Sequence, residues 1–220
     1  MNYLENLIER HPILKDNKVQ IDNAYKLLFN CFKNGNKVLI CGNGGSSADA
    51  GHIMGELMKR FNKDRKVTDD LKKQLRNVIE KGVASLVFDD QDLKYNEMLK
   101  NLEQGLPTID LTAFNPLNTA YANDRDDKYV FANSVLGLGK EEDVLLAITT
   151  SGNSMNVINA CAVAKAKKMK IISLTGREGG KIKNISDVSI IVPYKDTYLI
   201  QEEHLSIYHA LCLQLEEDIF

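Results

Sequence analysis

The 220-residue sequence has no long apolar run, no paired-cysteine motif and little net charge. Because no run approaches the length of a membrane span, we do not expect a membrane protein. A formal net charge of -2 leaves no electrostatic case for binding nucleic acid. The N-terminus lacks a basic start and an apolar signal core, so we expect a cytoplasmic protein.

Cysteines are few, and none of them form a C-x-x-C pair; they stand at Cys31, Cys41, Cys161 and Cys212. We interpret them as reduced core residues, which excludes a disulfide framework and a zinc knuckle. The sequence also contains no fixed-period repeat and no low-complexity segment. Its hydrophobic fraction of 44% is ordinary for a globular protein. We therefore predict a single α/β domain over residues 1–220.

A strand, a glycine-rich turn and a helix are predicted between residues 37 and 61. The apolar run Val38–Cys41 predicts a strand buried on both faces. The turn GNGGSS follows at 42–47, and small and apolar residues then recur at helical spacing. This order places backbone N–H groups and the positive end of a helix in front of an anion. The turn alone is equally consistent with a plain tight connection, because it matches neither a dinucleotide fingerprint nor a P-loop.

A second polar turn, TTSGNS at 149–154, follows the predicted buried strand 143–148 and precedes a helix predicted over 155–167. Its four hydroxyls belong to Thr149, Thr150, Ser151 and Ser154. Any one of them is ordinarily a helix cap. The whole cluster at a helix start favours a phosphate monoester.

Strands and helices alternate along most of the chain. Further strands are predicted at 108–111, 170–174 and 188–192, and further helices at 19–32, 114–123, 129–138 and 199–217. This alternation predicts an open parallel sheet with helices on both faces. Ligands bind such sheets at the carboxyl ends of strands, where the winding direction switches. The charged stretch 62–106 is predicted to be a helical insertion, a pair of surface helices over 67–79 and 95–104.

Two segments carry groups suited to proton transfer or metal binding. His52 and Glu56 are four residues apart and share one helix face. The C-terminal segment IQEEHLSIYH contains Gln201, His204 and His209. A lone histidine is usually structural, but two helices that each carry His with Glu or Gln are better candidates for acid–base or metal chemistry.

The motifs GNGGSSADAGHIMGEL, TTSGNSMNVI and IQEEHLSIYH together resemble the sugar isomerase (SIS) family. Within that family they are most similar to the phosphoheptose isomerases, and the resemblance covers residues 37–61 and 108–220. It implies a flavodoxin-like parallel sheet, preceded here by N-terminal helices, and a homotetramer with sites between subunits. It also implies an aldose–ketose isomerase that converts sedoheptulose 7-phosphate to D-glycero-D-manno-heptose 7-phosphate.

The same resemblance implies the roles of individual residues. Zinc would be bound by His52, Glu56, Gln201 and His209, with Glu56 and His209 as the acid–base pair. Contacts to substrate, which include Glu56 and Gln201, would further come from Asn43, Gly44, Gly45, Ser46, Asn123, Asp124, Thr149, Thr150, Ser151 and Ser154. The chemistry agrees, because an enediol route needs a base, an acid and a group that stabilises an oxyanion.

The linear spacing limits the zinc prediction. Gln201 and His209 are eight residues apart, or about 12 Å along a regular helix. Both could reach one ion only if Gln201 lies on a frayed helix start or if subunits share the site. His204 could also replace one of them.

The sequence departs from the family at two places, and other functions stay open. The segment 62–106 is longer and more charged than in compact members, and Tyr198 and Leu199 stand where a small residue and an arginine are usual. Both changes bear on the choice of sugar, so an isomerase for another sugar or a sugar-phosphate sensor is an alternative. Another is a non-catalytic SIS protein that binds phosphosugars or protein partners, like the replication-initiator-associated relatives, which lack a glutamate at the position of Glu56.

Overall fold

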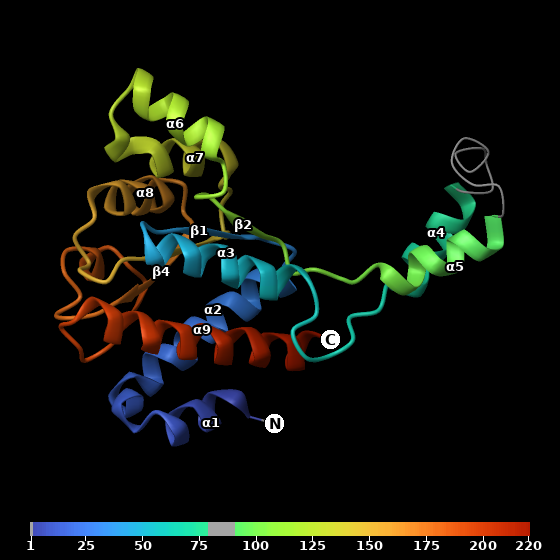
Figure 1. Cartoon of the computed structure of the whole chain (residues 1–220), viewed down its shortest axis with the longest axis horizontal. Coiled ribbons are helices and arrows are strands. Elements are labelled where there is room, and N and C mark those ends of the chain that lie inside the picture. The colour runs from blue at the N-terminus through green and yellow to red at the C-terminus, as the bar shows by residue number, and fades with distance from the viewer. Residues whose placement is uncertain (1, 79–90) are drawn as a thin grey trace.

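Five parallel strands form one sheet in the order β2-β1-β3-β4-β5 in the computed structural model, which describes residues 2–78 and 91–220 (Figure 1). The strands are β1 (Val38–Cys41), β2 (Thr108–Asp110), β3 (Val144–Ile148), β4 (Lys170–Thr175) and β5 (Val188–Ile191). The chain passes from β1 to β2 at one side and returns to β3 at the other. The winding therefore reverses between β1 and β3, as in flavodoxin-like sheets, which confirms the predicted fold class.

Helices cover both faces of this sheet (Figure 1). One face packs against α1 (Tyr3–Arg10), α2 (Lys18–Lys33), α3 (Gly45–Met58) and α9 (Thr197–Ile219). The other face packs against α7 (Val130–Leu138) and α8 (Met155–Ala166), with α6 (Asn115–Asp124) beside them. Short 3-10 turns lie at Pro12–Asn17, Asp127–Tyr129 and Ile182–Asn184. Among the described helices, none is both long and apolar enough to span a membrane.

Strands β1 and β3 are apolar along their whole length because both of their faces are buried. Val38 and Ile40 belong to the core under α2, α3 and α9, while Leu39 and Cys41 belong to the core under α7 and α8. Each such side chain contributes about 1.5–3 kcal/mol through burial. All four cysteines are buried and free, as the sequence predicts.

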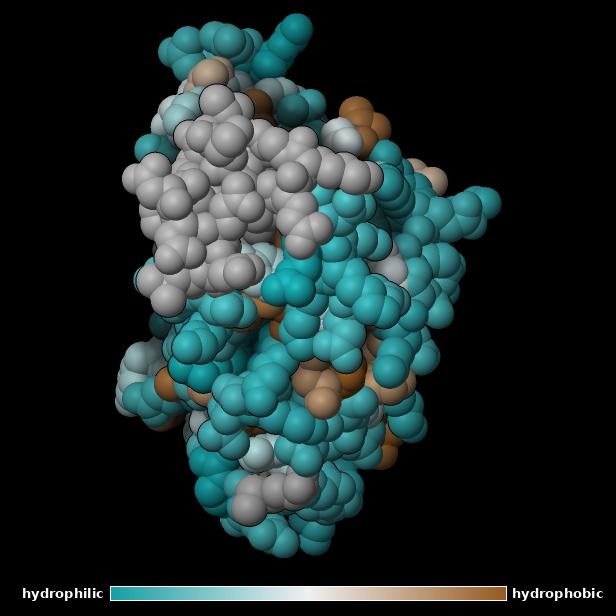
Figure 2. All heavy atoms as spheres, turned by 90° about the vertical axis from the view of Figure 1, so that its right-hand side faces the viewer, coloured by the Kyte–Doolittle hydropathy of each residue, from teal (hydrophilic) through white to brown (hydrophobic). Residues whose placement is uncertain are grey.

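The predicted insertion contains α4 (Asp69–Val78) and α5 (Gln91–Asn101), which project away from the sheet (Figure 1). Residues 67–102 are called the arm below. Tyr95 packs against Leu75, Met98 and Leu99 in a cluster separate from the two main cores, and its hydroxyl donates to the Lys72 carbonyl at 2.8 Å. Seen from the arm's end, the described surface is mostly hydrophilic (Figure 2). The arm therefore has its own small apolar contact.

The structure differs from the prediction at the end of α5 and at the base of the arm. Helix α5 runs over Gln91–Asn101, not over 95–104, and the residues that follow form no helix before β2. Gln104 N–H donates to the Arg65 carbonyl, and Leu106 N–H donates to the Leu57 carbonyl. Residues 62–66 are also not simply surface, since the Arg65 side chain is fully buried.

Arg65 forms a buried ion pair with Glu216 of α9. The Nε–Oε1 distance is 2.8 Å, and the two side chains are 0% and 2% exposed. Glu216 also accepts backbone N–H groups from Phe61, Asn62 and Lys63. Burial alone would raise the pKa of Glu216, but these hydrogen bonds and Arg65 outweigh it and lower the pKa. The carboxylate therefore stays charged and holds the loop after α3 against α9.

We expect that the arm can be deleted without loss of stability only if the deletion leaves this ion pair intact. Lys66 and Glu103 face each other as an antiparallel bridge, so residues 68–101 can be replaced by a two-glycine turn. We expect this variant to keep the Tm of the full chain within a few degrees in a thermal melt. A deletion of 64–104 also removes Arg65 and should cost about 3–5 kcal/mol, because it leaves Glu216 buried and unpaired. Equal destabilisation by both deletions would contradict this account.

Candidate active site

The two polar turns predicted from sequence meet at the β1–β3 switch point. The glycine turn follows β1 and leads into α3, and the hydroxyl turn follows β3 and leads into α8. Asn43 of the glycine turn and Asn156, in the first turn of α8 just after the hydroxyl turn, form two amide hydrogen bonds with N–O distances of 2.9 and 2.8 Å. Gly44 stands at φ +55°, a conformation that favours glycine. The predicted anion-binding elements thus lie side by side.

The hydroxyls of the second turn bond within the turn instead of capping α8. Ser154 is the residue before α8, and its side chain makes no cap hydrogen bond. Its Oγ lies 3.0 Å from Thr149 Oγ1, and Ser151 Oγ accepts the Asn153 N–H at 3.2 Å. Ser46 is buried in the first turn of α3. The ordinary capping role therefore does not explain Ser154, which leaves the phosphate interpretation in place.

Helices α3 and α9 run side by side in the same direction (Figure 1). At their N-terminal ends the Gln201 amide packs against Gly45, where a Cβ atom would lie 2.2 Å from Gln201 Nε2. Farther along, His52 of α3 contacts the Tyr208 and His209 rings of α9, with centroid distances of 5.5 and 5.0 Å. The two helices thus bring the predicted acid–base segments together.

His52, Glu56 and His209 form one cluster. His52 Nε2 lies 3.4 Å from Glu56 Oε1, and the Glu56 side chain is 14% exposed. Within the described residues, Glu56 Oε2 and His209 Nε2 are buried and have no hydrogen-bond partner, although Lys59 Nζ forms a longer ion-pair contact with Glu56 Oε2 at 3.6 Å. Burial and the nearby His52 lower the pKa of His209, although Glu56 acts in the opposite sense. His209 thus lies in the same cluster as Glu56, with a ring nitrogen that has no hydrogen-bond partner among the described residues.

Asp49 and Tyr208 adjoin this cluster and were not predicted. Tyr208 Oη lies 2.9 Å from His52 Nδ1 and donates to Asp49 Oδ1 at 3.4 Å. Burial raises the pKa of Asp49 and of Tyr208. Asp49 and His52 are three residues apart on α3, and this helical spacing is the sequence signal from which Asp49 could have been predicted as a neighbour of His52. Tyr208 stands inside the quoted C-terminal motif.

Three predicted site residues lie apart from the cluster. Gln201 sits beside Gly45, two helical turns before His209, on a helix that is already regular from Thr197. Asn123 and Asp124 are exposed at the end of α6, where Asn123 donates to Asp124 at 3.0 Å. Among described contacts, none joins Asn123 or Asp124 to the two polar turns.

His204 is a structural residue in this chain. It is fully buried, and its Nε2 lies 3.1 Å from the Thr175 carbonyl at the end of β4. Since α9 points it into the core, it does not join His52 and His209.

The cluster has donor atoms of the kinds that zinc prefers, but the described residues of one chain do not arrange them as a complete site. Two imidazoles and a carboxylate are suitable zinc donors, and the free Glu56 and His209 atoms fit that use. However, across residues 2–78 and 91–220 no group of three or more His, Cys, Asp or Glu side chains is arranged to hold an ion. The donor types fit zinc, but a single chain does not complete the site.

Comparison with known proteins agrees with the geometry. The sequence model of the SIS domain family matches residues 2–76 and 103–176. Phosphoheptose isomerase of Aliarcobacter butzleri is 36% identical over 199 residues, 90% of this chain and 85% of that protein. The enzyme of that name from Helicobacter pylori is 39% identical over 192 residues, 87% and 80% of the two chains.

Solved structures give the same result. A phosphoheptose isomerase from Francisella tularensis superposes with a TM-score of 0.70 at 32% identity, covering 90% of this chain and 85% of that chain. The Neisseria gonorrhoeae enzyme superposes with a TM-score of 0.67 at 33% identity, covering 89% and 85%. The fold and the match to the family model together show that the chain is a SIS-domain protein. More narrowly, the chain belongs to the phosphoheptose isomerase family and is a phosphosugar isomerase.

Burial of His204 predicts acid sensitivity. Burial lowers its pKa from the ordinary 6.5 to about 4. On acidification the unfolded chain therefore binds a proton first, so this contribution to stability is present above pH 6.5 and is lost as the pH falls towards 4. Between pH 6.5 and pH 5 the loss is about 2 kcal/mol.

Denaturant unfolding of wild type and His204→Gln at both pH values tests this. The variant should lose about 2 kcal/mol less than wild type, because other groups titrate equally in both proteins. An identical loss in the two proteins would show that His204 is protonated in the fold.

Proposed function

We propose that this protein interconverts sedoheptulose 7-phosphate and D-glycero-D-manno-heptose 7-phosphate. The relatives named phosphoheptose isomerase, aligned over most of their length, support the substrate. The observation that carries the chemistry is that Glu56 and His209 belong to one cluster, each with a buried atom that has no hydrogen-bond partner among the described residues. The cytoplasmic location stays a prediction.

The reaction moves a proton between C1 and C2. Glu56 removes a proton from C1 of the ketose, and the electron pair forms the C1=C2 bond of an enediol while the C2 oxygen takes a proton from His209. Glu56 then delivers its proton to C2, and His209 recovers a proton from the C1 oxygen as the C1 carbonyl forms. The Glu56 side chain is only 14% exposed, so little water competes with the substrate for its carboxylate.

The two polar turns would hold the phosphate. Their N–H groups and hydroxyls, from Asn43 to Ser46 and from Thr149 to Ser154, lie at the N-terminal ends of α3 and α8. Binding the phosphate away from the reacting carbons fixes the substrate relative to Glu56. Asn123 and Asp124 remain predicted sugar contacts.

We further propose that zinc binds at His52, Glu56 and His209, with Gln201 as a fourth donor. When bound, zinc would act as a Lewis acid on the substrate oxygens. Because Gln201 lies on a regular helix two turns from His209, a partner subunit would have to bring its own Gln201 to the cluster. A homotetramer with sites between subunits meets this requirement.

Conservative substitutions test the acid–base pair. Glu56→Gln and His209→Gln should each lower kcat for sedoheptulose 7-phosphate by a factor of about 10²–10⁴, because each loses a positioned proton-transfer group. Glu202→Gln, an exposed change on α9, is the matched control and should keep full activity. Metal content is measured on every variant. If Glu56→Gln turns over normally, Glu56 is not the base, and if wild type converts no sugar phosphate, the non-catalytic alternative gains.

Mixed oligomers test the shared site. His209→Gln and Gln201→Ala chains, co-expressed with different tags and purified through both, should recover activity and zinc, because some sites then combine an intact cluster with an intact Gln201. A mixture of His209→Gln and His52→Gln is the control and should stay inactive, since both changes affect the same half-site. No recovery in the first mixture would place the whole site in one chain.

A further inference from the structure

The two polar turns lack a cation. Residues 43–46 and 149–154 contain no Lys or Arg. A phosphate monoester carries a charge of about -1.5 to -2 at neutral pH. Hydroxyls and N–H groups can bond its oxygens, but the charge is best balanced by cations nearby. The source of that positive charge is not among the residues that the motifs indicate.

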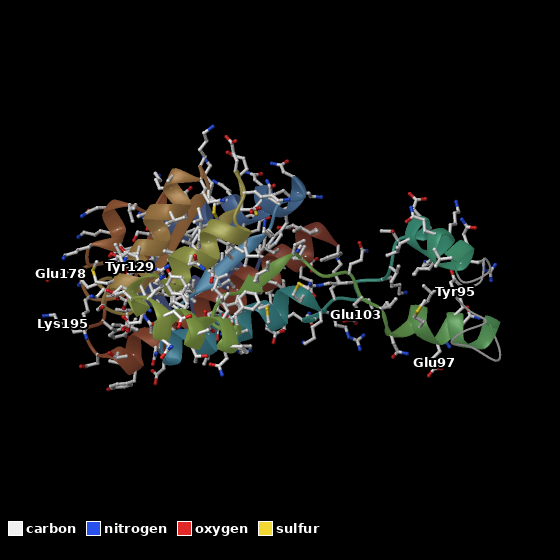
Figure 3. All side chains as sticks on the ribbon, turned by 90° about the horizontal axis from the view of Figure 1, so that it is seen from above. Tyr95, Glu97, Glu103, Tyr129, Glu178 and Lys195 are labelled. Atoms are coloured by element: carbon white, nitrogen blue, oxygen red, sulfur yellow. The ribbon has the colours of Figure 1, made fainter. Side chains whose placement is uncertain are left out.

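Two cationic side chains line a pocket of about 420 Å³ next to the hydroxyl turn. The pocket is lined by Ser151, Asn153, Arg177, Glu178, Gly180 and Lys195. Ser151 follows β3, Arg177 follows β4 and Lys195 follows β5, so the pocket lies at the carboxyl ends of neighbouring strands. Figure 3 shows Glu178 and Lys195 at the end of the molecule opposite the arm.

The loop that carries Arg177 is bonded to the hydroxyl turn. Gly176 N–H donates to the Thr150 carbonyl at 3.1 Å, and Lys181 N–H donates to Asn153 Oδ1 at 3.1 Å. The Gly152 backbone packs directly on Gly179 and Gly180, leaving no room for a Cβ atom. The two loops therefore form one unit, and Arg177 keeps its place beside Ser151.

Arg177 itself is held by its backbone and by one side-chain nitrogen. Its φ is +57°, which is unusual for a non-glycine residue, and its N–H donates to the Tyr194 carbonyl at 2.7 Å. Its Nε donates to the Lys195 carbonyl at 3.2 Å. Among the described residues, neither Arg177 nor Lys195 forms an ion pair. Two cations against the Glu178 carboxylate give the pocket a net positive charge.

We propose that Arg177 and Lys195 bind the phosphate of the substrate together with Ser151. This inference rests on the proposed function, and it assigns phosphate recognition to two residues outside the motifs. The terminal nitrogens of Arg177 suit two phosphate oxygens at once, and Lys195 adds a point charge. The two residues then select for sugars that carry a phosphate monoester.

Binding and kinetics of charge-removing variants test the proposal. Arg177→Gln and Lys195→Gln should each raise KM for sedoheptulose 7-phosphate, and the Kd for inorganic phosphate in a calorimetric titration, by about tenfold or more. KM should rise by a larger factor than kcat falls, because the proton-transfer groups are untouched while the phosphate that positions the substrate is held less tightly. Arg177→Lys should recover part of the loss. Ser151→Ala with Ser154→Ala is the comparison, and it should weaken phosphate binding similarly.

Controls separate pocket binding from general charge and from fold. Lys181→Gln removes the same charge from the same loop without lining the pocket, and it should bind phosphate as wild type does. Added salt should weaken wild-type binding more than that of the Arg177→Gln, Lys195→Gln double variant, since exposed charges are screened. If Arg177→Gln does not fold, Lys195→Gln carries the test alone.

Two outcomes overturn the proposal. One is a double variant that binds inorganic phosphate and sugar phosphate as tightly as wild type. The other is a wild type that binds neither. Failure of the proposed function looks different, because a wild type without isomerase activity can still bind phosphate through Arg177 and Lys195 in the titration.

Discussion

The side-by-side packing of α3 and α9 is the constraint on which the site depends. At one end, Gly45 has no side chain, so Gln201 can lie against it. At the other, Glu216 pairs with Arg65, and Arg65 donates to the carbonyls of Leu57 and Glu56 at the end of α3. Burying such a pair costs desolvation energy that offsets much of its attraction, whereas removing one partner would leave the other charge buried and uncompensated. Through its carbonyl, Glu56 is therefore bonded to the Arg65–Glu216 ion pair.

Because of this packing, the proposed anion-binding turns and the proposed proton-transfer groups lie at different points along α3. From Gly45 to His52 the axis of α3 advances about 10 Å. In the proposed function, the positive end of α3, where Asn43 and Asn156 bond to each other, would face the phosphate, and the Glu56 cluster would face the reacting carbons. Such a separation suits a sugar phosphate, whose phosphate positions carbons that react elsewhere.

Much of this arrangement could be predicted from the sequence, because continuous apolar runs such as Val38–Cys41 are typical of strands buried on both faces. Polar turns after two of those strands predicted the switch-point site. The Arg65–Glu216 ion pair could not be predicted, because Arg65 lies in a charged stretch and its partner is 151 residues away in the sequence. The separation of Gln201 from His209 followed from spacing alone, whereas the burial of His204 depended on the rotation of α9, which spacing does not determine.

Hydrogen exchange with solvent is the most direct measurement of the enediol chemistry. Sedoheptulose 7-phosphate is incubated with the protein in deuterium oxide, and proton NMR follows the C1 hydrogens of the ketose and the C2 hydrogen of the aldose. The account predicts deuterium at both carbons with wild type and none with Glu56→Gln at equal substrate occupancy. Exchange by Glu56→Gln at the wild-type rate would contradict it.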